Sequence, residues 1–236
     1  MRSAARQDSA YVLHVRRYRE NSLLVEALTA NAGRLALVAR GSGRTRRSPS
    51  EAVQPFRELL LVFQGRDELQ TLLRAEPLGP PPLLQGERLI SGLYANELVF
   101  RLTGRGEGDS ALYSLYARTV AALAGETPLE PLLRRFEVGL LQLAGYGVDF
   151  TATADTGSAI DEEGNYFFVP EAGFLTQSPG TGAPRLQGRT LLALGGHREF
   201  EDETLREAKH FMRQLLKHQL GDRPLNARTL FSTASD

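Results

Sequence analysis

The 236-residue sequence contains no cysteine. Without cysteine the chain forms no disulfide bond, and it offers neither a thiolate zinc ligand nor a cysteine nucleophile. It also has no apolar run of about 18 residues, the length that a transmembrane helix needs. The opening residues MRSAARQDSA lack the apolar segment of a signal peptide. These absences predict a cytoplasmic protein with no membrane partner.

Catalytic signatures are missing as well. Lys209 and Lys217 are the only lysines, so no Walker A motif exists, and no Gly-x-Ser-x-Gly elbow occurs. Glu207 and His210 form a single Glu-x-x-His pair, whereas a carboxylate-bridged di-metal site needs two. We therefore expect no catalytic residue, no metal site, no cofactor and no enzymatic activity. A nuclease remains a third interpretation, although no constellation of metal ligands supports it.

Acidic residues are scarce in the first third of the chain. The whole sequence has 28 basic and 28 acidic residues, but residues 1–80 hold 13 arginines against 8 acids, a net charge of 13 − 8 = +5. From Arg34 to Arg47 there are five arginines and no Asp or Glu. A Gly/Ser-rich loop cannot bury such charge, so this segment is expected to face an anionic partner.

Five strand-like runs occupy this basic part, with a hairpin signal at Asn31-Ala32-Gly33. They are Tyr11–Arg17, Ser22–Thr29, Arg34–Ala39, Val53–Phe63 and Leu69–Ala75. Their number and spacing predict a small five-stranded barrel of the OB-fold type, although the apolar run Leu59–Phe63 is also compatible with a helix. The proline-rich segment 77–82 then reads as a domain linker.

Helical periodicity follows the linker. Helices are expected over Glu87–Leu102, 110–124, the stretch to Gly145 that Thr127 opens with a capping box, and Asp202–Leu220. The Gly- and Thr-rich residues 150–187 contain two short strand-like runs, at 166–169 and 174–176. The predicted class is α+β: an OB-fold barrel followed by an all-helical domain with a small β insert. The expected domains are residues 1–78 (nucleic-acid-binding barrel), 79–149 with 188–236 (helical domain) and 150–187 (insert).

Exposed arginines on such a barrel are typical of nucleic-acid binding, because OB-folds bind the backbone of single strands. The candidate DNA-binding residues are Arg16, Arg17, Arg19, Arg34, Arg40, Arg44, Arg46 and Arg47. Tyr18 and Phe56 could stack on bases or belong to the core. The competing interpretation is a solvated basic edge that keeps the protein soluble.

A second basic group lies on the predicted helices. Leu133, Arg134, Arg135, Val138, Arg206 and Lys209 could line an apolar groove with a basic rim. Such a groove suits an acidic tail that ends in an apolar residue, because arginine pairs with carboxylates. Pairing of Glu130 with Arg134 along one helix would be the alternative use of this charge.

Several sequence blocks resemble the recombination mediator family RecO. The blocks are VLHVRRYRENSLLVEALTANAGRLALVARGSGR, AVQPFRELLLVFQGRDELQTLLRAE, SGLYANEL, PLLRRFEVGLLQLAGYGVDF and GDRPLNARTLF. They occur in collinear order over nearly the whole chain. The resemblance implies an N-terminal OB-fold, a helical domain and a small β insert.

The resemblance also implies a function. RecO proteins bind single- and double-stranded DNA and anneal complementary strands without hydrolysing a nucleotide. With RecR they promote loading of RecA onto DNA coated by the single-stranded-DNA-binding protein (SSB), whose acidic C-terminal tail they contact. The implied site of action is the nucleoid, with the OB-fold arginines on DNA and the LRRFE helix with Arg206 on the SSB tail. The alternative is an OB-fold RNA-binding or ribosome-associated adaptor.

One feature departs from the family pattern. Many RecO proteins carry four zinc-binding cysteines in the insert, and residues 150–187 contain none. Metal binding is therefore not expected here. The 166–176 hairpin would have to be stabilised by its own apolar contacts.

Overall fold

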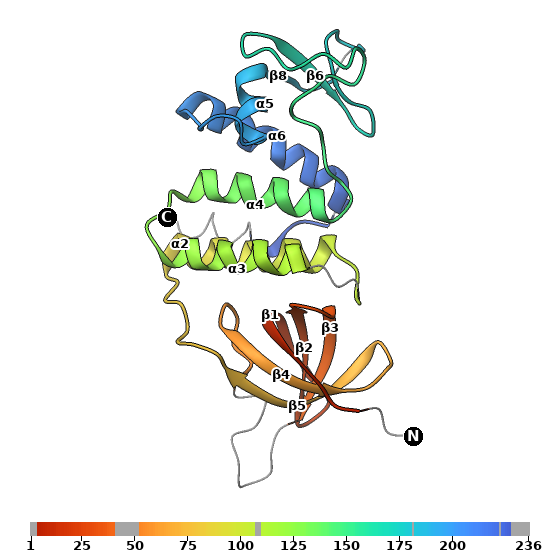
Figure 1. Cartoon of the computed structure of the whole chain (residues 1–236), viewed down its shortest axis with the longest axis vertical. Coiled ribbons are helices and arrows are strands. Elements are labelled where there is room, and N and C mark those ends of the chain that lie inside the picture. The colour runs from red at the N-terminus through yellow and green to blue at the C-terminus, as the bar shows by residue number, and fades with distance from the viewer. Residues whose placement is uncertain (1–3, 41–51, 107–109, 181, 222, 228–236) are drawn as a thin grey trace. The chain divides into compact units, whose positions relative to one another are not determined.

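The chain folds into two compact units (Figure 1). The computed structural model describes residues 4–40, 52–106, 110–180, 182–221 and 223–227. One unit comprises Met1–Glu126 and Pro224–Asp236, and the other comprises Thr127–Arg223. The chain thus leaves the first unit after Glu126 and returns to it at Pro224.

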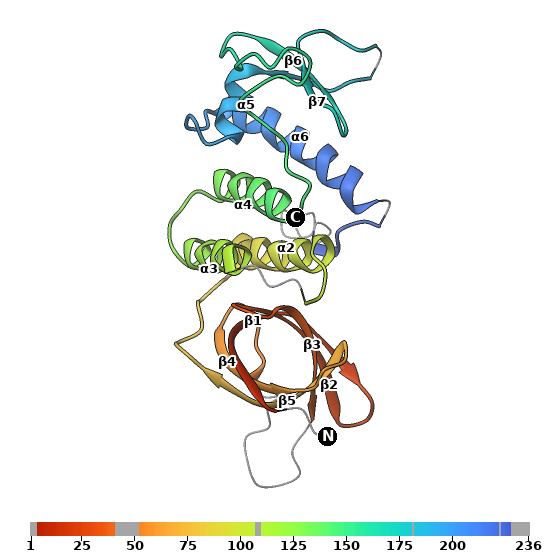
Figure 2. The same cartoon turned by 45° about the vertical axis from the view of Figure 1, so that its right-hand side comes forward.

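The first unit is built on a closed five-stranded barrel, seen as a ring of strands in Figure 2. Its strands are β1 (Arg6–Tyr18), β2 (Ser22–Thr29), β3 (Gly33–Arg40), β4 (Glu58–Gln64) and β5 (Leu69–Pro77). They follow the order β1-β2-β3-β5-β4, and only β3 and β5 pair in parallel. The predicted OB-fold barrel is confirmed, and the run Leu59–Phe63 is strand rather than helix.

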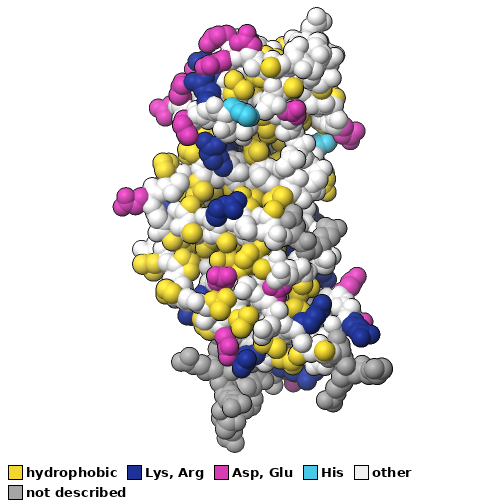
Figure 3. Space-filling view, viewed as in Figure 1, with side chains coloured by type: hydrophobic (Ala, Val, Ile, Leu, Met, Phe, Trp, Pro, Cys, Tyr) yellow, Lys and Arg dark blue, Asp and Glu magenta, His cyan; other side chains and the backbone are white. Residues whose placement is uncertain are grey.

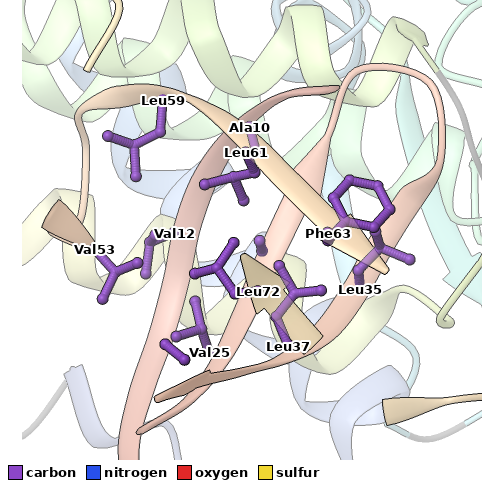
Figure 4. Packing of buried hydrophobic residues seen from close by; sticks show 12 residues of the cluster. Ala10, Val12, Val25, Leu35, Leu37, Val53, Leu59, Leu61, Phe63 and Leu72 are labelled. Atoms are coloured by element: carbon purple, nitrogen blue, oxygen red, sulfur yellow. The ribbon is translucent and has the colours of Figure 1, made fainter. Parts of the chain in front are cut away.

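Alternation of side chains produces the barrel core. Leu59, Leu61 and Phe63 on β4 are buried, while the residues between them are only partly buried. They meet Val25 and Leu37 from β2 and β3 inside the ring (Figure 4). Burying each such side chain contributes about 1.5–3 kcal/mol. Apolar packing therefore stabilises the surface on which the arginines lie.

Two helices complete the first unit: α2 (Gly86–Leu102) and α3 (Ser110–Ala124). Asn96 on α2 donates its amide to the carbonyl of Leu13 on β1 at 3.1 Å and accepts a hydrogen bond from the Tyr116 hydroxyl of α3. Tyr113 of α3 donates its hydroxyl to the Glu58 carboxylate at 2.6 Å. The helices are thus joined to the barrel by polar contacts as well as by apolar ones.

The second unit contains α4 (Leu129–Leu143), α5 (Gly188–Leu194) and α6 (Asp202–Leu220), with a sheet ordered β7-β6-β8. The strands are β6 (Asn165–Val169), β7 (Gly173–Leu175) and β8 (Arg185–Gln187). The β6–β7 hairpin was predicted, whereas β8 and α5 were not. Each of these two elements is short, and their positions depend on partners distant in sequence.

The predicted start of α4 is wrong. Pro128, not Thr127, occupies the N-cap position of this helix, and no side-chain capping bond is made there. A capping box instead begins α6, where the Glu201 and Thr204 side chains each bond the backbone of the other. The helix therefore begins one residue later than the capping-box pattern predicts.

A cluster of four phenylalanines holds the insert to α6. Phe150, Phe168 and Phe174 surround Phe211 of α6, with ring centroids 5.0–6.5 Å apart, and all four are buried. Within the described residues no group of three or more potential ligands is placed to bind a metal ion. Residues 150–187 contain neither cysteine nor histidine, so a thiolate zinc site does not fit this insert. Aromatic packing supplies the cross-link instead.

The compact units divide the chain at a different place from the predicted domains. Helices α2 and α3 belong to the same unit as the barrel, although the proline-rich segment 77–82 separates them in sequence. The C-terminal segment returns to this unit as well. The Glu97 carboxylate accepts hydrogen bonds from the backbone amides of Asn226 and Ala227, both at 3.0 Å.

Candidate functional site

Exposed arginines gather at one end of the barrel. The strand register aligns Arg17 with Leu23 and Ala39, and the neighbouring row aligns Tyr18 with Ser22 and Arg40. The turn that joins β1 to β2 therefore lies beside the end of β3. The exposed arginines of this end are Arg16, Arg17, Arg19 and Arg40. Figure 3 shows further basic side chains over the described part of the barrel.

Tyr18 is already engaged by one of these arginines. The Arg19 guanidinium lies 5.3 Å from the centre of the Tyr18 ring, a cation–π distance. Arg19 itself has a φ of 54°, which places the turn residue in the left-handed region. Glu20, in the same turn, is the acid that accompanies this cluster. A base could stack at Tyr18 in place of the guanidinium.

Three of the predicted DNA-binding residues, Arg44, Arg46 and Arg47, lie outside the described residues. They follow Arg40 closely in the chain. The structure adds another cation, Arg74, which pairs with Glu76 at 3.4 Å. Strands β3 and β5 run parallel, and Leu72 of β5 is paired with Ala39 of β3. Residues after Leu72 therefore lie beyond Ala39, so the exposed Arg74 belongs to the same end of the barrel as Arg40. Only the strand order reveals this.

Arg34 has a different environment. It is 9% exposed, and its guanidinium donates to the Glu26 carboxylate at 2.8 Å and to the Thr103 carbonyl at 2.8 and 3.2 Å. Burial lowers the pKa of Arg34 from its usual value, although Glu26 counteracts this effect. The structure therefore places Arg34 in a buried ion pair that joins β2 and β3 to the end of α2. Arg34 therefore does not belong to the exposed basic group at the end of the barrel.

Phe56 is also a packing residue. It is buried, and its ring lies so close to Gly92 of α2 that a Cβ added there would be 2.8 Å from the ring carbon Cε1. The structure therefore favours the core interpretation for Phe56 over base stacking.

The basic residues on the helices surround a carboxylate. Glu130 lies 2.5 Å from the Lys209 ammonium and 4.0 Å from the Arg134 guanidinium, so it joins α4 to α6. Arg134 is 5% exposed and also bonds Glu137 at 2.7 Å, while its Nε and Nη1 atoms make no hydrogen bond. Leu133 is 6% exposed. Both the intrahelical pairing and the α4–α6 proximity considered from sequence are present.

The remaining predicted residues of this group are more accessible. Arg135 pairs with Glu199 at 3.3 Å and lies 5.6 Å from the centre of the Phe200 ring. Val138 lines an open pocket of about 640 Å³ together with Val148 and Phe150. Arg206 is exposed on the same face of α6 as Lys209. A half-buried apolar surface of this unit thus has exposed cations on both α4 and α6.

Asp149 adds a negative charge to the Val138 pocket. The hydroxyl and backbone amide of Thr151 both donate to its carboxylate at 2.7 Å. These hydrogen bonds lower the pKa of Asp149 and keep it ionised. The ionised Asp149 therefore disfavours a negatively charged group on its side of the pocket.

Within the described residues, none of the helices is long and apolar enough to cross a membrane. The strand order and the added helices define the class: an OB-fold barrel protein with a second, helical unit. Two family models match the sequence, "Recombination protein O N terminal" over residues 1–81 and "Recombination protein O C terminal" over residues 83–229. The chain belongs to the RecO family.

Curated relatives agree with this assignment. The chain is 41% identical over 224 residues to the DNA repair protein RecO of Tolumonas auensis, covering 94% of this chain and 93% of the relative. It is 43% identical over 224 residues to the DNA repair protein RecO of an Escherichia coli strain, covering 94% and 92% of the two chains. The RecO of Azoarcus sp. is 38% identical over 226 residues, with 94% and 93% covered.

Proposed function

We propose that this chain is a non-enzymatic mediator of DNA repair and homologous recombination. It binds single- and double-stranded DNA, anneals complementary strands and, with RecR, promotes RecA loading onto SSB-coated DNA at the nucleoid. The observation that carries the proposal is the group of exposed arginines at the β1–β2 end of an OB-fold barrel. The similarity to DNA repair proteins RecO supplies the DNA repair context.

The physical basis of DNA binding is release of counterions from the phosphate backbone. Arg16, Arg17, Arg19 and Arg40 are exposed together, and Arg44, Arg46 and Arg47 follow in the sequence. If about five of them neutralise phosphates, the logarithm of the affinity falls with the logarithm of salt concentration with a slope of roughly −3 to −4 on single strands. This interaction does not depend on base sequence, as annealing requires.

Binding of the SSB tail is proposed for the helical unit. Arg134 and Lys209 already hold one carboxylate, that of Glu130, between α4 and α6. A tail carboxylate can compete with Glu130 for these cations. The same two helices also carry Arg135 and the apolar Val138 on α4 and Arg206 on α6. Capture of the tail raises the local concentration of the protein on coated DNA without tight DNA binding.

The test is annealing of two complementary oligonucleotides that are precoated with SSB, with or without its acidic tail. We expect acceleration with intact SSB and much less with tailless SSB. Charge reversal at Arg16 and Arg17 should weaken binding of uncoated DNA at least tenfold. The matched control reverses the exposed Arg66 and Arg118, which lie away from the β1–β2 turn.

Equal acceleration on both forms of SSB would contradict tail capture. If the Arg16 and Arg17 reversals bind and anneal DNA like the control, the barrel interface is wrong. A preference for structured RNA over single-stranded DNA would instead support the RNA-adaptor alternative.

A further inference from the structure

Helix α6 carries an exposed row of basic side chains that the proposed function does not use. His210, Arg213 and Lys217 follow one another at spacings of three and four residues, so they share one face of the helix. All three are exposed. From Ala208 to Gly221 the sequence has no Asp or Glu. We call these three residues the α6 row.

The α6 row is not explained by the stability of the helix. Arg213 has Lys209 four residues before it and Lys217 four residues after it, and like charges at this spacing destabilise a helix. Lys209 is compensated by Glu130, but Arg213 and Lys217 form no ion pair with any described residue. Lys217 lies in the last turn, where a cation interacts favourably with the helix dipole. Arg213 lies before that turn and gains nothing comparable.

The spacing of the row suits a ligand with repeated negative charge. Seven residues separate His210 from Lys217, which corresponds to about 10 Å along a helix. Each strand of duplex DNA carries one phosphate per about 3.4 Å of helix axis, so a row of this length can contact more than one phosphate. A single carboxylate is too small to contact the whole length of the row. Toward the N-terminus of α6 the same face continues with the exposed Arg206, and Asp202 and Glu203 precede it in the first turn.

We propose that the α6 row is a second phosphate-backbone surface, which holds the second DNA strand while the barrel holds the first. This inference rests on the proposed function, since it assumes that the barrel binds DNA. Annealing joins two polyanions that repel each other. Two cationic surfaces on separate units allow each strand to be neutralised before the strands meet.

The experiment compares the R213E/K217E variant of the full chain with an R118E/R185E variant that carries the same change in total charge. We expect annealing of uncoated complementary oligonucleotides to slow at least tenfold in R213E/K217E. Binding of the first single strand should weaken no more than about threefold, because the barrel arginines are intact. The R118E/R185E control should retain both activities.

Folding is controlled by the milder R213Q/K217Q variant. Removal of like charges should leave its Tm unchanged or slightly raised, whereas annealing should still slow. The R213K variant keeps the positive charge at position 213 and should preserve annealing, because a point charge is sufficient for a phosphate contact.

Two outcomes would overturn the inference. One is normal annealing by R213E/K217E under conditions in which charge reversal at Arg16 and Arg17 abolishes it, a result that leaves the proposed function intact. The other is normal annealing of uncoated DNA combined with loss of SSB-tail binding, which would assign the row to a protein partner. Failure of the unmodified protein to bind DNA at all would instead refute the proposed function.

Discussion

Gly92 lies within α2, in the SGLYANEL block that is among the strongest features of the family resemblance. A Cβ at this position would be 2.8 Å from Phe56 Cε1 and 3.2 Å from Leu84 Cδ1. Asn96, one turn further on, joins β1 to α3, and Glu97 binds the returning C-terminal segment. This block therefore holds the first unit together.

Gly92→Ala tests this packing role. Alanine is ordinarily better than glycine within a helix by about 0.5–1 kcal/mol, but overpacking costs about 1–3 kcal/mol. We expect a net loss of about 1 kcal/mol in the free energy of unfolding, measured by urea denaturation. The control is Gly125→Ala, where the nearest atom to an added Cβ is 3.6 Å away.

A second substitution makes this prediction sharper. Phe56→Leu removes ring atoms that the new methyl group would meet, so G92A should cost less in that background than in the unmodified protein. If G92A is equally destabilising in both backgrounds, the contact with Phe56 is not the cause.

Residue type alone did not distinguish binding arginines from structural ones. Arg16 and Arg34 are both strand arginines in the basic part of the chain, yet Arg34 is buried against Glu26 and the Thr103 carbonyl. Thr103 is 69 residues away in sequence. Because that partner comes from the end of α2, no local pattern could identify it.

Among the elements, the insert shows how one packing solution can replace another. The turn between β6 and β7 was predicted correctly, and its residues Glu171 and Gly173 have positive φ values of 66° and 112°. The docking of this hairpin depends on Phe211, which belongs to α6 and lies far along the chain. Sequence periodicity predicted that Phe211 lies on a helix. It could not predict that the Phe211 ring packs beside Phe168.

Removal of metal should therefore not destabilise the insert. We expect a chelator to leave the Tm unchanged, because aromatic packing and not a thiolate site stabilises residues 150–187. Phe211→Ala, in contrast, should cost about 3–5 kcal/mol, since it opens a cavity among three rings. Differential scanning calorimetry measures both effects. A fall in Tm on chelation would reveal a structural metal and contradict this account.

At the scale of the whole molecule, a tyrosine cluster makes the stability of the first unit sensitive to alkali. Tyr11, Tyr113 and Tyr116 form a contact cluster in the first unit, with ring centroids 5.1 and 5.4 Å apart. Burial raises the pKa of all three, and the Glu58 carboxylate raises those of Tyr11 and Tyr113 further. Their neutral forms are thus favoured by folding.

The first unit should consequently lose stability above about pH 10, the ordinary pKa of tyrosine. A raised folded-state pKa gives a contribution that is complete below the unfolded pKa and is lost as pH rises. We expect its melting transition to move downward between about pH 9 and pH 11, as followed by calorimetry and tyrosinate absorbance. Tyr113→Phe should reduce this slope, at the expense of its hydrogen bond to Glu58 at neutral pH. An unchanged slope would show that Tyr113 does not contribute.

The sequence by itself determined the five strands, most of the helices, the OB-fold barrel and the cysteine-free insert, because alternation, helical periodicity and turn residues are local properties. It also identified Arg16, Arg17 and Arg40 as candidate DNA-binding cations. Only the tertiary structure decided that Arg34 and Arg134 are buried in ion pairs, that Arg74 lies near Arg40 and that Arg213 remains unpaired. The reason is physical: burial and charge pairing depend on partners from distant segments, and these partners meet only when strand order and helix packing are established.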